Sequence, residues 1–167
     1  MPILVETYPL DPKKPLKKTI ERLRYWVGLL VIWIGMIVIS ARVNPVAFSL
    51  ISPLVIILIA VVLIAMLALA TYIYELFYLK YYFYDIVGST LIIRKGVFSR
   101  NEITVAFNRL QDVYVDQDIL DRLFGLYDIH VSSATITSGT LSHIDGLPKD
   151  HAKVIKELIL KKIGKDD

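Results

Sequence analysis

Residues 25–41 read YWVGLLVIWIGMIVISA, a run without charged side chains between Arg24 and Arg42. As a helix that rises ~1.5 Å per residue, this run extends about 25 Å, near the lower limit for crossing a bilayer. A second uncharged run follows from Val43 to Tyr74. Prolines near its start are compatible with the first turn of a helix, which places the second span at roughly Pro53–Phe77.

The two spans are predicted to form one membrane hairpin over residues 25–79. The link between them, about Arg42–Ser52, is too short to hold a domain. We expect neither span to contain Asp, Glu, Lys, Arg or His. Because ion and proton pathways need charged groups inside the membrane, we expect no transport by this chain alone. A cleaved signal peptide is the alternative for the first span, but its apolar run is long for a signal peptide and a second span follows at once.

The positive charge of the chain is concentrated before the first span. With 167 residues and a net charge of +3, the composition alone suggests nucleic acid, but acids and bases balance from Lys80 onward. A basic segment beside a membrane sets topology and attracts anionic lipid, so we expect no nucleic-acid partner. We predict contacts with the membrane surface for the basic residues of this segment: Lys13, Lys14, Lys17, Lys18, Arg22 and Arg24.

Residues 1–24 are predicted to form a basic amphipathic segment. Leu16, Ile20 and Leu23 recur with the spacing of one helical face, which suits a short helix in the headgroup layer before the chain turns into the membrane. A role as a topology signal explains the same residues. Only Arg42 opposes the segment across the first span, so the positive-inside rule predicts a multi-pass protein of the cell (inner) membrane with both termini in the cytoplasm.

Residues 80–167 are predicted to form a cytoplasmic domain that is mainly β. Tyr82–Val87 and Thr90–Lys95 flank Gly88-Ser89 and indicate a hairpin. Alternating apolar residues and turn signals predict further strands at Ile103–Phe107, Val113–Val115, Tyr127–Val131, Thr135–Thr137 and Leu141–Ile144.

Two helices complete this α+β domain. Asp118 and Asp121 have the spacing of a capping box for a short helix, and Gly125 supplies the left-handed residue that ends it. Pro148 opens a last helix with an apolar face. About six or seven short strands followed by one amphipathic helix predict a curved sheet or open barrel that this helix caps.

The most specific stretch begins at Asn108 with NRLQDV and continues with Gln117, Leu120 and, from Arg122, RLFGL. It resembles the central signature of the membrane-flanked bacterial pleckstrin-homology-like (PH-like) family, the YdbS-like group. The resemblance covers Leu79–Ile163, and the two preceding spans fit the family's usual layout. It implies a PH-like barrel with a C-terminal helix, no catalytic function, and an adaptor or assembly role beside a related membrane protein that carries PH-like domains.

The signature residues are interpreted as structural: Arg109, Gln111, Val113, Leu120, Arg122 and Gly125. Arg109 and Gln111 can hydrogen-bond backbone groups at a strand entry, and a glycine can adopt dihedral angles that other residues avoid. Leu120, Leu123 and Phe124 are expected to pack against the sheet. Residues 131–134 read VSSA, where relatives tend to show a Thr-Ala-Gly type of turn, and this departure puts a ligand role of the turn in doubt.

No recognisable catalytic pattern occurs in the sequence. Cysteine is absent, which excludes disulfides, thiolate metal sites and cysteine nucleophiles. No G-x-S-x-G, H-E-x-x-H or glycine-rich phosphate loop is present. His143 and His151, with Asp145 and Asp150, could gather around a metal. Because these histidines are predicted to lie in a loop and at the start of a helix, we interpret them as ordinary surface residues. We predict no enzyme activity, no metal, no cofactor and no small-molecule substrate.

Three functions are weighed on these observations. The first is a membrane-anchored interaction module that assembles with itself or with a related membrane protein, favoured by the PH-like pattern without a catalytic set. The alternative is recognition of an anionic lipid headgroup, with Arg94, Lys95 and Arg100 near the first hairpin as candidate contacts. The third is a hydrolase or transferase that depends on the histidines or scattered aspartates. A defined oligomer would favour the first, and a monomer with one enriched anionic lipid the second.

Overall fold

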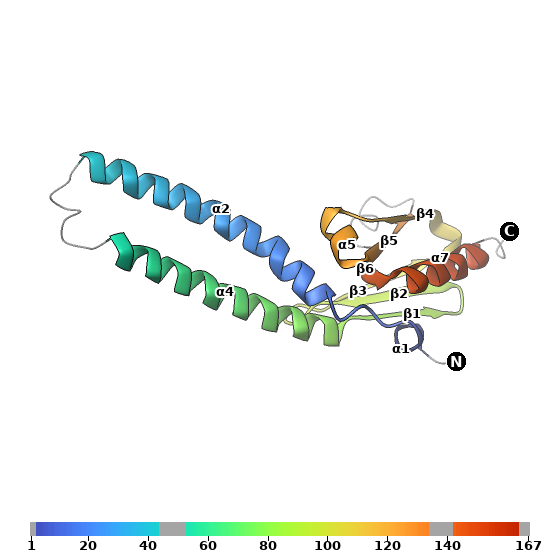
Figure 1. The fold of residues 1–167 in the computed structure, drawn as a ribbon. Helices are drawn as coiled ribbons and strands as arrows, with labels where there is room; N and C mark the ends of the chain where they lie inside the picture. Colours follow the sequence, from blue (N-terminus) through green and yellow to red (C-terminus); the bar gives the residue numbers. More distant parts are fainter. Residues whose placement is uncertain (1–2, 44–52, 134–141, 164–167) are drawn as a thin grey trace. The chain divides into compact units, whose positions relative to one another are not determined.

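A computed structural model describes residues 3–43, 53–133 and 142–163 (Figure 1). The predicted strand Thr135–Thr137, the first residue of Leu141–Ile144 and most of the predicted link Arg42–Ser52 lie outside the described residues.

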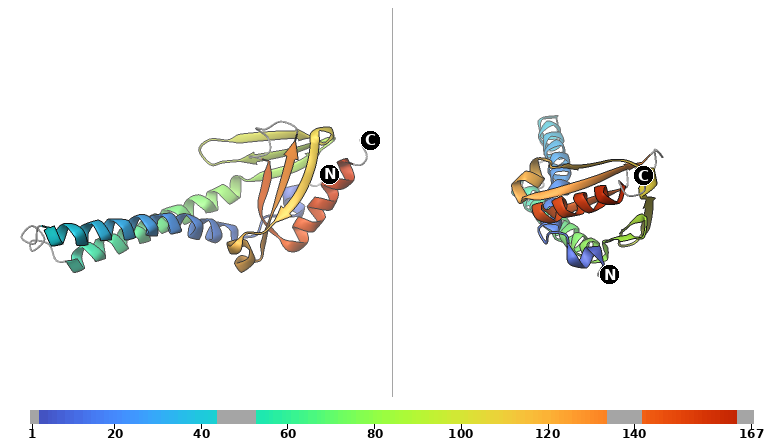
Figure 2. Two further views of the ribbon diagram at one scale, coloured as in Figure 1. Left: turned by 90° about the horizontal axis from the view of Figure 1, so that it is seen from above. Right: turned by 90° about the vertical axis from the view of Figure 1, so that its right-hand side faces the viewer.

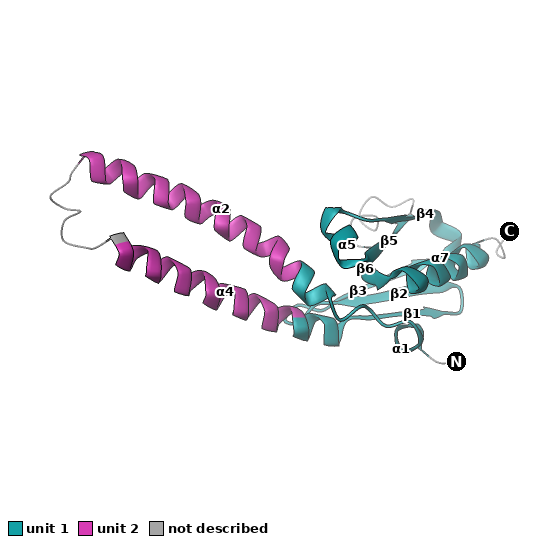
Figure 3. Cartoon of the chain, in the orientation of Figure 1, with its two compact units in different colours: residues 1–17, 76–167 teal, residues 18–75 magenta. Residues whose placement is uncertain are grey.

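The chain folds into two compact units (Figure 3). We call residues 1–17 together with 76–167 the β-rich unit, and residues 18–75 the helical unit. We predicted divisions after residues 24 and 79, whereas the structure divides the chain after residues 17 and 75. The first 17 residues therefore fold with the β-rich unit.

The helical unit takes its residues from two long helices, α2 (Lys14–Val43) and α4 (Pro53–Tyr81). Both are long and apolar enough to cross a membrane, by length and composition. Good helix formers dominate the basic segment and Pro15 lies in the first turn, so α2 continues into the apolar run without a break. The turn that we predicted between a surface helix and the first span is therefore wrong.

Among the described residues, the β-rich unit contains two three-stranded antiparallel sheets, with the strand orders β1-β2-β3 and β4-β5-β6. The predicted hairpin around Gly88-Ser89 is confirmed as β1 and β2. The bounds are β1 Phe83–Val87, β2 Thr90–Lys95, β3 Asn101–Ala106, β4 Leu110–Asp116, β5 Leu126–Ser133 and β6 His143–Pro148.

The helices of the β-rich unit lie at its connections and ends. They are α1 (Leu4–Thr7), the 3-10 turn η1 (Phe107–Arg109), α5 (Ile119–Phe124) and α7 (Lys149–Ile163). α7 packs on the second sheet (Figure 2). It begins after Pro148, which ends β6, whereas we expected this proline in the first turn of the helix.

The predicted capping box of α5 is confirmed. The carboxylate of Asp118 accepts a hydrogen bond from the backbone N–H of Asp121 at 2.6 Å, and the carboxylate of Asp121 accepts one from the N–H of Asp118 at 3.3 Å. Gly125 ends the helix in the left-handed region with φ of 71°. The mainly β domain with a C-terminal helix that the sequence predicts is therefore present.

Both sheets and α7 contribute to one core, together with residues 3–17, which we call the N-terminal segment. Its most deeply buried large apolar side chains are Tyr84, Leu91, Ile93, Phe107, Ile129, Ile144, Leu147, Ile155 and Ile159. Leu4 and Leu10, each 8% exposed, complete the core from the N-terminal segment. The backbone N–H of Leu4 donates to Asp85 Oδ1 at 3.0 Å, and the Tyr84 hydroxyl donates to the carbonyl of Tyr8. The N-terminal segment is thus part of the fold of this unit.

Candidate anion-binding cleft

A cleft of about 420 Å³ lies between the β2–β3 turn and the last residue of α4. All three residues that we predicted as lipid or anion contacts line it. The full lining is Tyr81, Arg94, Lys95, Gly96, Arg100, Asn101 and Glu102.

The register of β2 and β3 arranges the polar groups of the cleft. Arg94 pairs with Glu102 across the two strands, and its Nε donates to Glu102 Oε2 at 2.7 Å. Both side chains are 52% exposed, so this ion pair contributes at most about 1 kcal/mol and can rearrange around a ligand. Gly96 has φ of 110°, and a Cβ there would lie 1.9 Å from the carbonyl oxygen of Ser99, so the turn requires glycine.

Aromatic rings lie beside the basic groups of the cleft. The Arg94 guanidinium is 4.9 Å from the centre of the Phe83 ring, and that of Arg100 is 5.6 Å from the Tyr81 ring. Cation–π contacts of this kind orient a cation without neutralising it. Lys95 is only 8% exposed, and its Nζ lies 5.7 Å from the ring of Tyr82.

The charges of the cleft suit a phosphate group. Three cations and the carboxylate of Glu102 leave two positive charges among its lining residues. The phosphodiester of an anionic phospholipid carries one negative charge and a phosphate monoester about −1.5 to −2 at neutral pH, so either is attracted to this net positive charge. Tyr82 adds no negative charge behind Lys95, because burial, followed by the charge of Asp145, raises the pKa of its hydroxyl well above the usual value.

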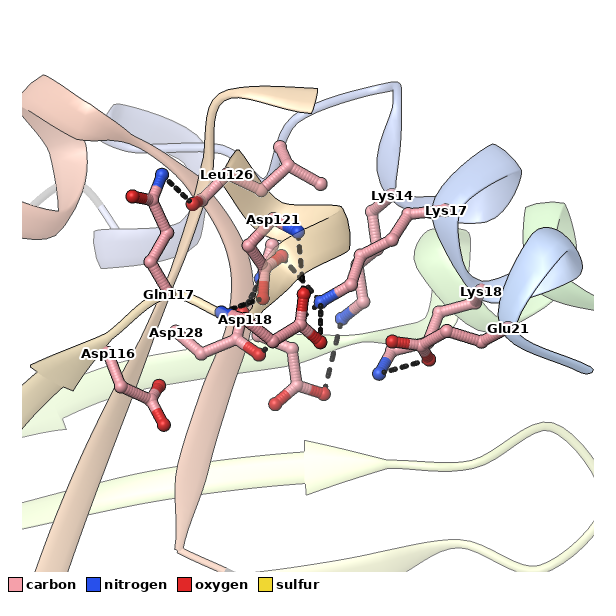
Figure 4. A network of polar contacts seen from close by, with 12 residues as sticks. Lys14, Lys17, Lys18, Glu21, Asp116, Gln117, Asp118, Asp121, Leu126 and Asp128 are labelled. Atoms are coloured by element: carbon pink, nitrogen blue, oxygen red, sulfur yellow. Dashed lines mark hydrogen bonds and ion pairs between the residues drawn. The ribbon is translucent and has the colours of Figure 1, made fainter. Parts of the chain in front are cut away.

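A second polar cluster surrounds Lys17, which is 1% exposed (Figure 4). Its Nζ donates to Asp121 Oδ1 at 2.5 Å and lies 3.5 Å from Asp118 Oδ2 and 3.8 Å from Asp128 Oδ2. We call these four residues the Lys17 cluster. It joins the N-terminal segment to α5 and β5.

The pKa values of Asp121 and Asp118 in the Lys17 cluster are shifted in opposite directions. Burial raises the pKa of Asp121, and the charges of Asp128 and Asp118 act in the same direction against the ammonium group of Lys17. Burial also acts to raise the pKa of Asp118, but the backbone N–H of Asp121 and the charge of Lys17 hold it below its usual value. One ammonium group among three carboxylates leaves this cluster with net negative charge when all are ionised.

Lys14 is buried in the same way, at 1% exposure. Its Nζ lies 3.8 Å from Asp145 Oδ2 and 4.0 Å from the centre of the Tyr82 ring. His143 Nε2 is 2.9 Å from the other oxygen of Asp145. Although burial acts to raise the pKa of Asp145, the hydrogen bond from His143 and the charge of Lys14 hold it well below the usual value.

Asp145 is expected to make the β-rich unit sensitive to acid. Its pKa is lower in the folded protein than in the unfolded chain, so the ionised carboxylate contributes stability above about pH 4, and this contribution is lost as the pH falls further. For Asp145→Asn, the difference in unfolding free energy from the wild type should depend on pH. Below about pH 4 it should shrink by up to ~1.4 kcal/mol per pH unit.

Hydrogen exchange of the β5 and β6 amides as a function of pH measures this difference. Asp121 contributes with the opposite sign because its pKa is raised, so only the comparison with Asp145→Asn isolates the single group. A difference that does not change between pH 7 and 3 would contradict the assignment.

The sequence analysis missed the roles of Lys14 and Lys17. We predicted that both contact the membrane surface, but in the structure both side chains are buried against aspartates of the β-rich unit. Two features of the sequence could have indicated this burial. The i, i+3 spacing places both lysines on one helical face, and aspartates at the ends of predicted strands could pair with them.

The other predicted surface cations belong to the exposed part of α2 or to the chain before it. Lys13 is exposed, and Lys18 pairs with Glu21 at 3.1 Å. Arg24 lies 5.2 Å from the ring of Tyr25. These residues, with Arg22, remain predicted membrane-surface contacts.

Arg22 pairs with Glu75 of α4 at 2.6 Å, within the helical unit. The Glu75 side chain is 3% exposed. Because Glu75 falls inside the second span that we predicted, Pro53–Phe77, the expectation that neither span contains a charged residue is wrong.

The signature residues lie along η1, β4 and α5. Val113 is buried and Leu120 is half-buried. The others do not share this burial: Arg109, Gln111, Arg122 and Gly125 are exposed. Leu123 is 75% exposed, so its predicted packing against the sheet is wrong.

The histidines occupy the second sheet and α7. His130 Nε2 lies 3.1 Å from Asp116 Oδ1, and the rings of His130 and His143 stack at 5.5 Å. His151 Nδ1 is 2.9 Å from the carbonyl oxygen of Pro9. Within the described part of the chain, no group of three or more histidine and carboxylate side chains is placed to hold a metal ion.

Two three-stranded antiparallel sheets and a C-terminal helix are consistent with a PH-like domain. The bacterial PH domain family model matches residues 19–163, and the chain therefore belongs to that family. No curated protein and no solved structure matches the chain. PH-like domains are generally binding modules without enzymatic activity, which suggests an interaction module.

Proposed function

We propose that the protein is a membrane-anchored, non-catalytic binding module that holds an anionic phospholipid headgroup in its basic cleft. One observation carries this proposal: Arg94, Lys95 and Arg100 line a single cleft with a net positive charge. A cleft of this charge can hold a phosphate through charge-assisted hydrogen bonds.

The membrane anchor in this proposal is the pair α2 and α4. The basic residues before Tyr25 support an orientation with both termini in the cytoplasm, and the YdbS-like layout of two spans before a PH-like domain supports the same arrangement. Tyr81, which lines the cleft, follows the end of the uncharged run at Tyr74 by about seven residues, or ~10 Å of helix. That length exceeds the roughly 6 Å of the headgroup layer by less than one helical turn, so a headgroup is within reach of the cleft.

Neutralising the cleft should reduce lipid retention. For Arg94→Gln/Arg100→Gln, we expect at least a tenfold loss of co-purifying phosphatidylglycerol, because two charge-assisted contacts, worth about 1.5–3 kcal/mol each, are removed. Native mass spectrometry of the full-length protein, extracted from vesicles of phosphatidylglycerol and phosphatidylcholine, measures the retained lipid.

Lys149→Gln/Lys153→Gln is the matched control, since both lysines are exposed on α7 and lie outside the cleft. It should retain phosphatidylglycerol as the wild type does. Equal retention by the cleft variant and the control would contradict the proposal. Competition by inorganic phosphate distinguishes a site for phosphate alone from one that also needs the lipid.

Assembly with a second copy or with a related PH-like membrane protein is the second candidate function. One specific observation favours it: in the described part of the chain, β3 is an outer strand of its sheet, with Asn101, Glu102 and Thr104 exposed. An outer strand can accept a strand of a partner through backbone hydrogen bonds. The mass of the full-length protein in nanodiscs tests this function, and a monomer that co-purifies with no other protein would contradict it.

A further inference from the structure

Helix α5 presents two large aliphatic side chains to solvent. Ile119 is 86% exposed and Leu123 is 75% exposed, more than any other large aliphatic side chain in the described part of the β-rich unit. Their i, i+4 spacing puts them on one face of the helix. Asp121, which is buried against Lys17, lies between them in sequence and projects from the opposite face. The fold of the unit therefore does not use this apolar face.

The contacts of α5 place it where the chain leaves the β-rich unit for the apolar helices. Asp121 binds Lys17, the last residue of the N-terminal part of this unit. From Lys17, the continuous helix α2 reaches the first uncharged run at Tyr25 after about eight residues, or ~12 Å. The headgroup layer adds roughly 6 Å on each side of the hydrocarbon core, so Lys17 lies about one helical turn beyond that layer when measured along α2, and docking requires the unit to incline toward the bilayer by about that distance.

A third apolar side chain lies where the chain returns to the same unit. Phe98, in the β2–β3 turn, is 90% exposed. Arg100 of this turn is 5.6 Å from the ring of Tyr81, the last residue of α4. Within the β-rich unit, α5 and the β2–β3 turn lie at the same end (Figures 1 and 2).

These side chains suit a bilayer better than a protein partner. A stable protein interface buries about 800 Å² on each partner, far more than two or three isolated side chains supply. A unit already anchored by two spans needs little further affinity, because its effective concentration at the surface is high. Asp116 and Asp118 are exposed near α5, so apolar burial rather than attraction to anionic lipid favours the contact.

We infer that Ile119 and Leu123, together with Phe98, insert into the boundary between headgroups and acyl chains and dock the β-rich unit on the bilayer. The partner of this surface is the lipid bilayer itself. The inference rests on the membrane anchor of the proposed function and is independent of the ligand of the basic cleft. Docking of this end brings the β2–β3 turn, and with it the cleft, to the headgroup layer.

Quenching by spin-labelled lipid tests the insertion on the full chain. The sequence contains no cysteine, so Ile119→Cys and Leu123→Cys can each be labelled with one environment-sensitive fluorophore in nanodiscs of phosphatidylcholine. A lipid that carries its nitroxide near the headgroup should quench both labels at least threefold more than a label at Lys153→Cys, an exposed position on α7. The unfolding temperature of each labelled protein checks that the fold is kept.

Each outcome bears on the inference separately from the cleft. Strong quenching that persists in the Arg94→Gln/Arg100→Gln background supports insertion without the headgroup site. Quenching no stronger than at position 153 overturns insertion, even where phosphatidylglycerol is still retained. Labels protected from lipid in a particle with the mass of a dimer overturn it in favour of a second copy that covers α5.

Discussion

Replacement of Lys17 with methionine is expected to lower the free energy of unfolding of the β-rich unit by about 3–5 kcal/mol, the usual cost of removing one partner of a buried ion pair. The ammonium group is surrounded by three carboxylates, and the nearest of them, Asp121, is 2% exposed at its side chain. Methionine keeps most of the volume of the lysine but leaves the carboxylates without a cation. The unfolding temperature of the full-length protein in nanodiscs should fall by roughly 10–20 °C.

Lys18→Met is the matched control for this prediction. Lys18 is 27% exposed and pairs with Glu21 near the surface, so its loss should cost no more than about 1 kcal/mol. Lys17→Met/Asp121→Asn should recover part of the lost stability, because the most deeply buried carboxylate is then neutral. If Lys17→Met and Lys18→Met unfold at the same temperature, Lys17 has no structural role.

Leu4→Ala/Leu10→Ala is expected to destabilise the β-rich unit by about 4 kcal/mol, because each buried leucine costs at least ~2 kcal/mol when truncated. Both side chains are 8% exposed and belong to the core of the two sheets and α7. They precede the first apolar helix, whereas the rest of this core follows the second. Chemical unfolding followed by hydrogen exchange of the β1 and β5 amides measures the loss.

Leu160→Ala on α7 serves as the control, since Leu160 is 45% exposed and its truncation removes little buried surface.

The same reasoning applies to a fragment of residues 80–167, the domain that we predicted from the sequence. Without Leu4, Leu10, Lys14 and Lys17, this fragment should unfold at a lower temperature than the same unit in the full chain. Equal stability of the fragment and the full chain would show that the N-terminal segment is dispensable.

The sequence predicted part of the candidate cleft. Arg94, Lys95 and Arg100 were recognised because basic residues near a predicted hairpin end are close in sequence. Tyr81 and Glu102 were not, because their place in the cleft depends on the pairing of β2 with β3 and on the end of α4. Strand register is decided by the packing of whole faces, and the sequence of one strand does not report it.

The exposed face of α5 was also beyond the sequence. A leucine at position 123 in an amphipathic pattern predicts burial, but Asp121 occupies the buried face because Lys17 lies there. Lys17 is far from α5 in the chain, so only tertiary structure brings them together. A buried polar group requires a partner, and here that requirement fixes which face of the helix points inward.

By itself, the sequence determined the features that follow from local patterns. Uncharged runs gave the two apolar helices, alternation and turn residues gave the hairpin of β1 and β2, and the Asp118–Asp121 spacing gave the capping box, since each depends on neighbours within a few residues. Tertiary structure alone decided that the first 17 residues belong to the β-rich unit and that Lys14 and Lys17 are buried. Those outcomes depend on contacts between segments separated by two long helices. The periodicity of a sequence reflects only neighbours along the chain, so it does not predict such contacts.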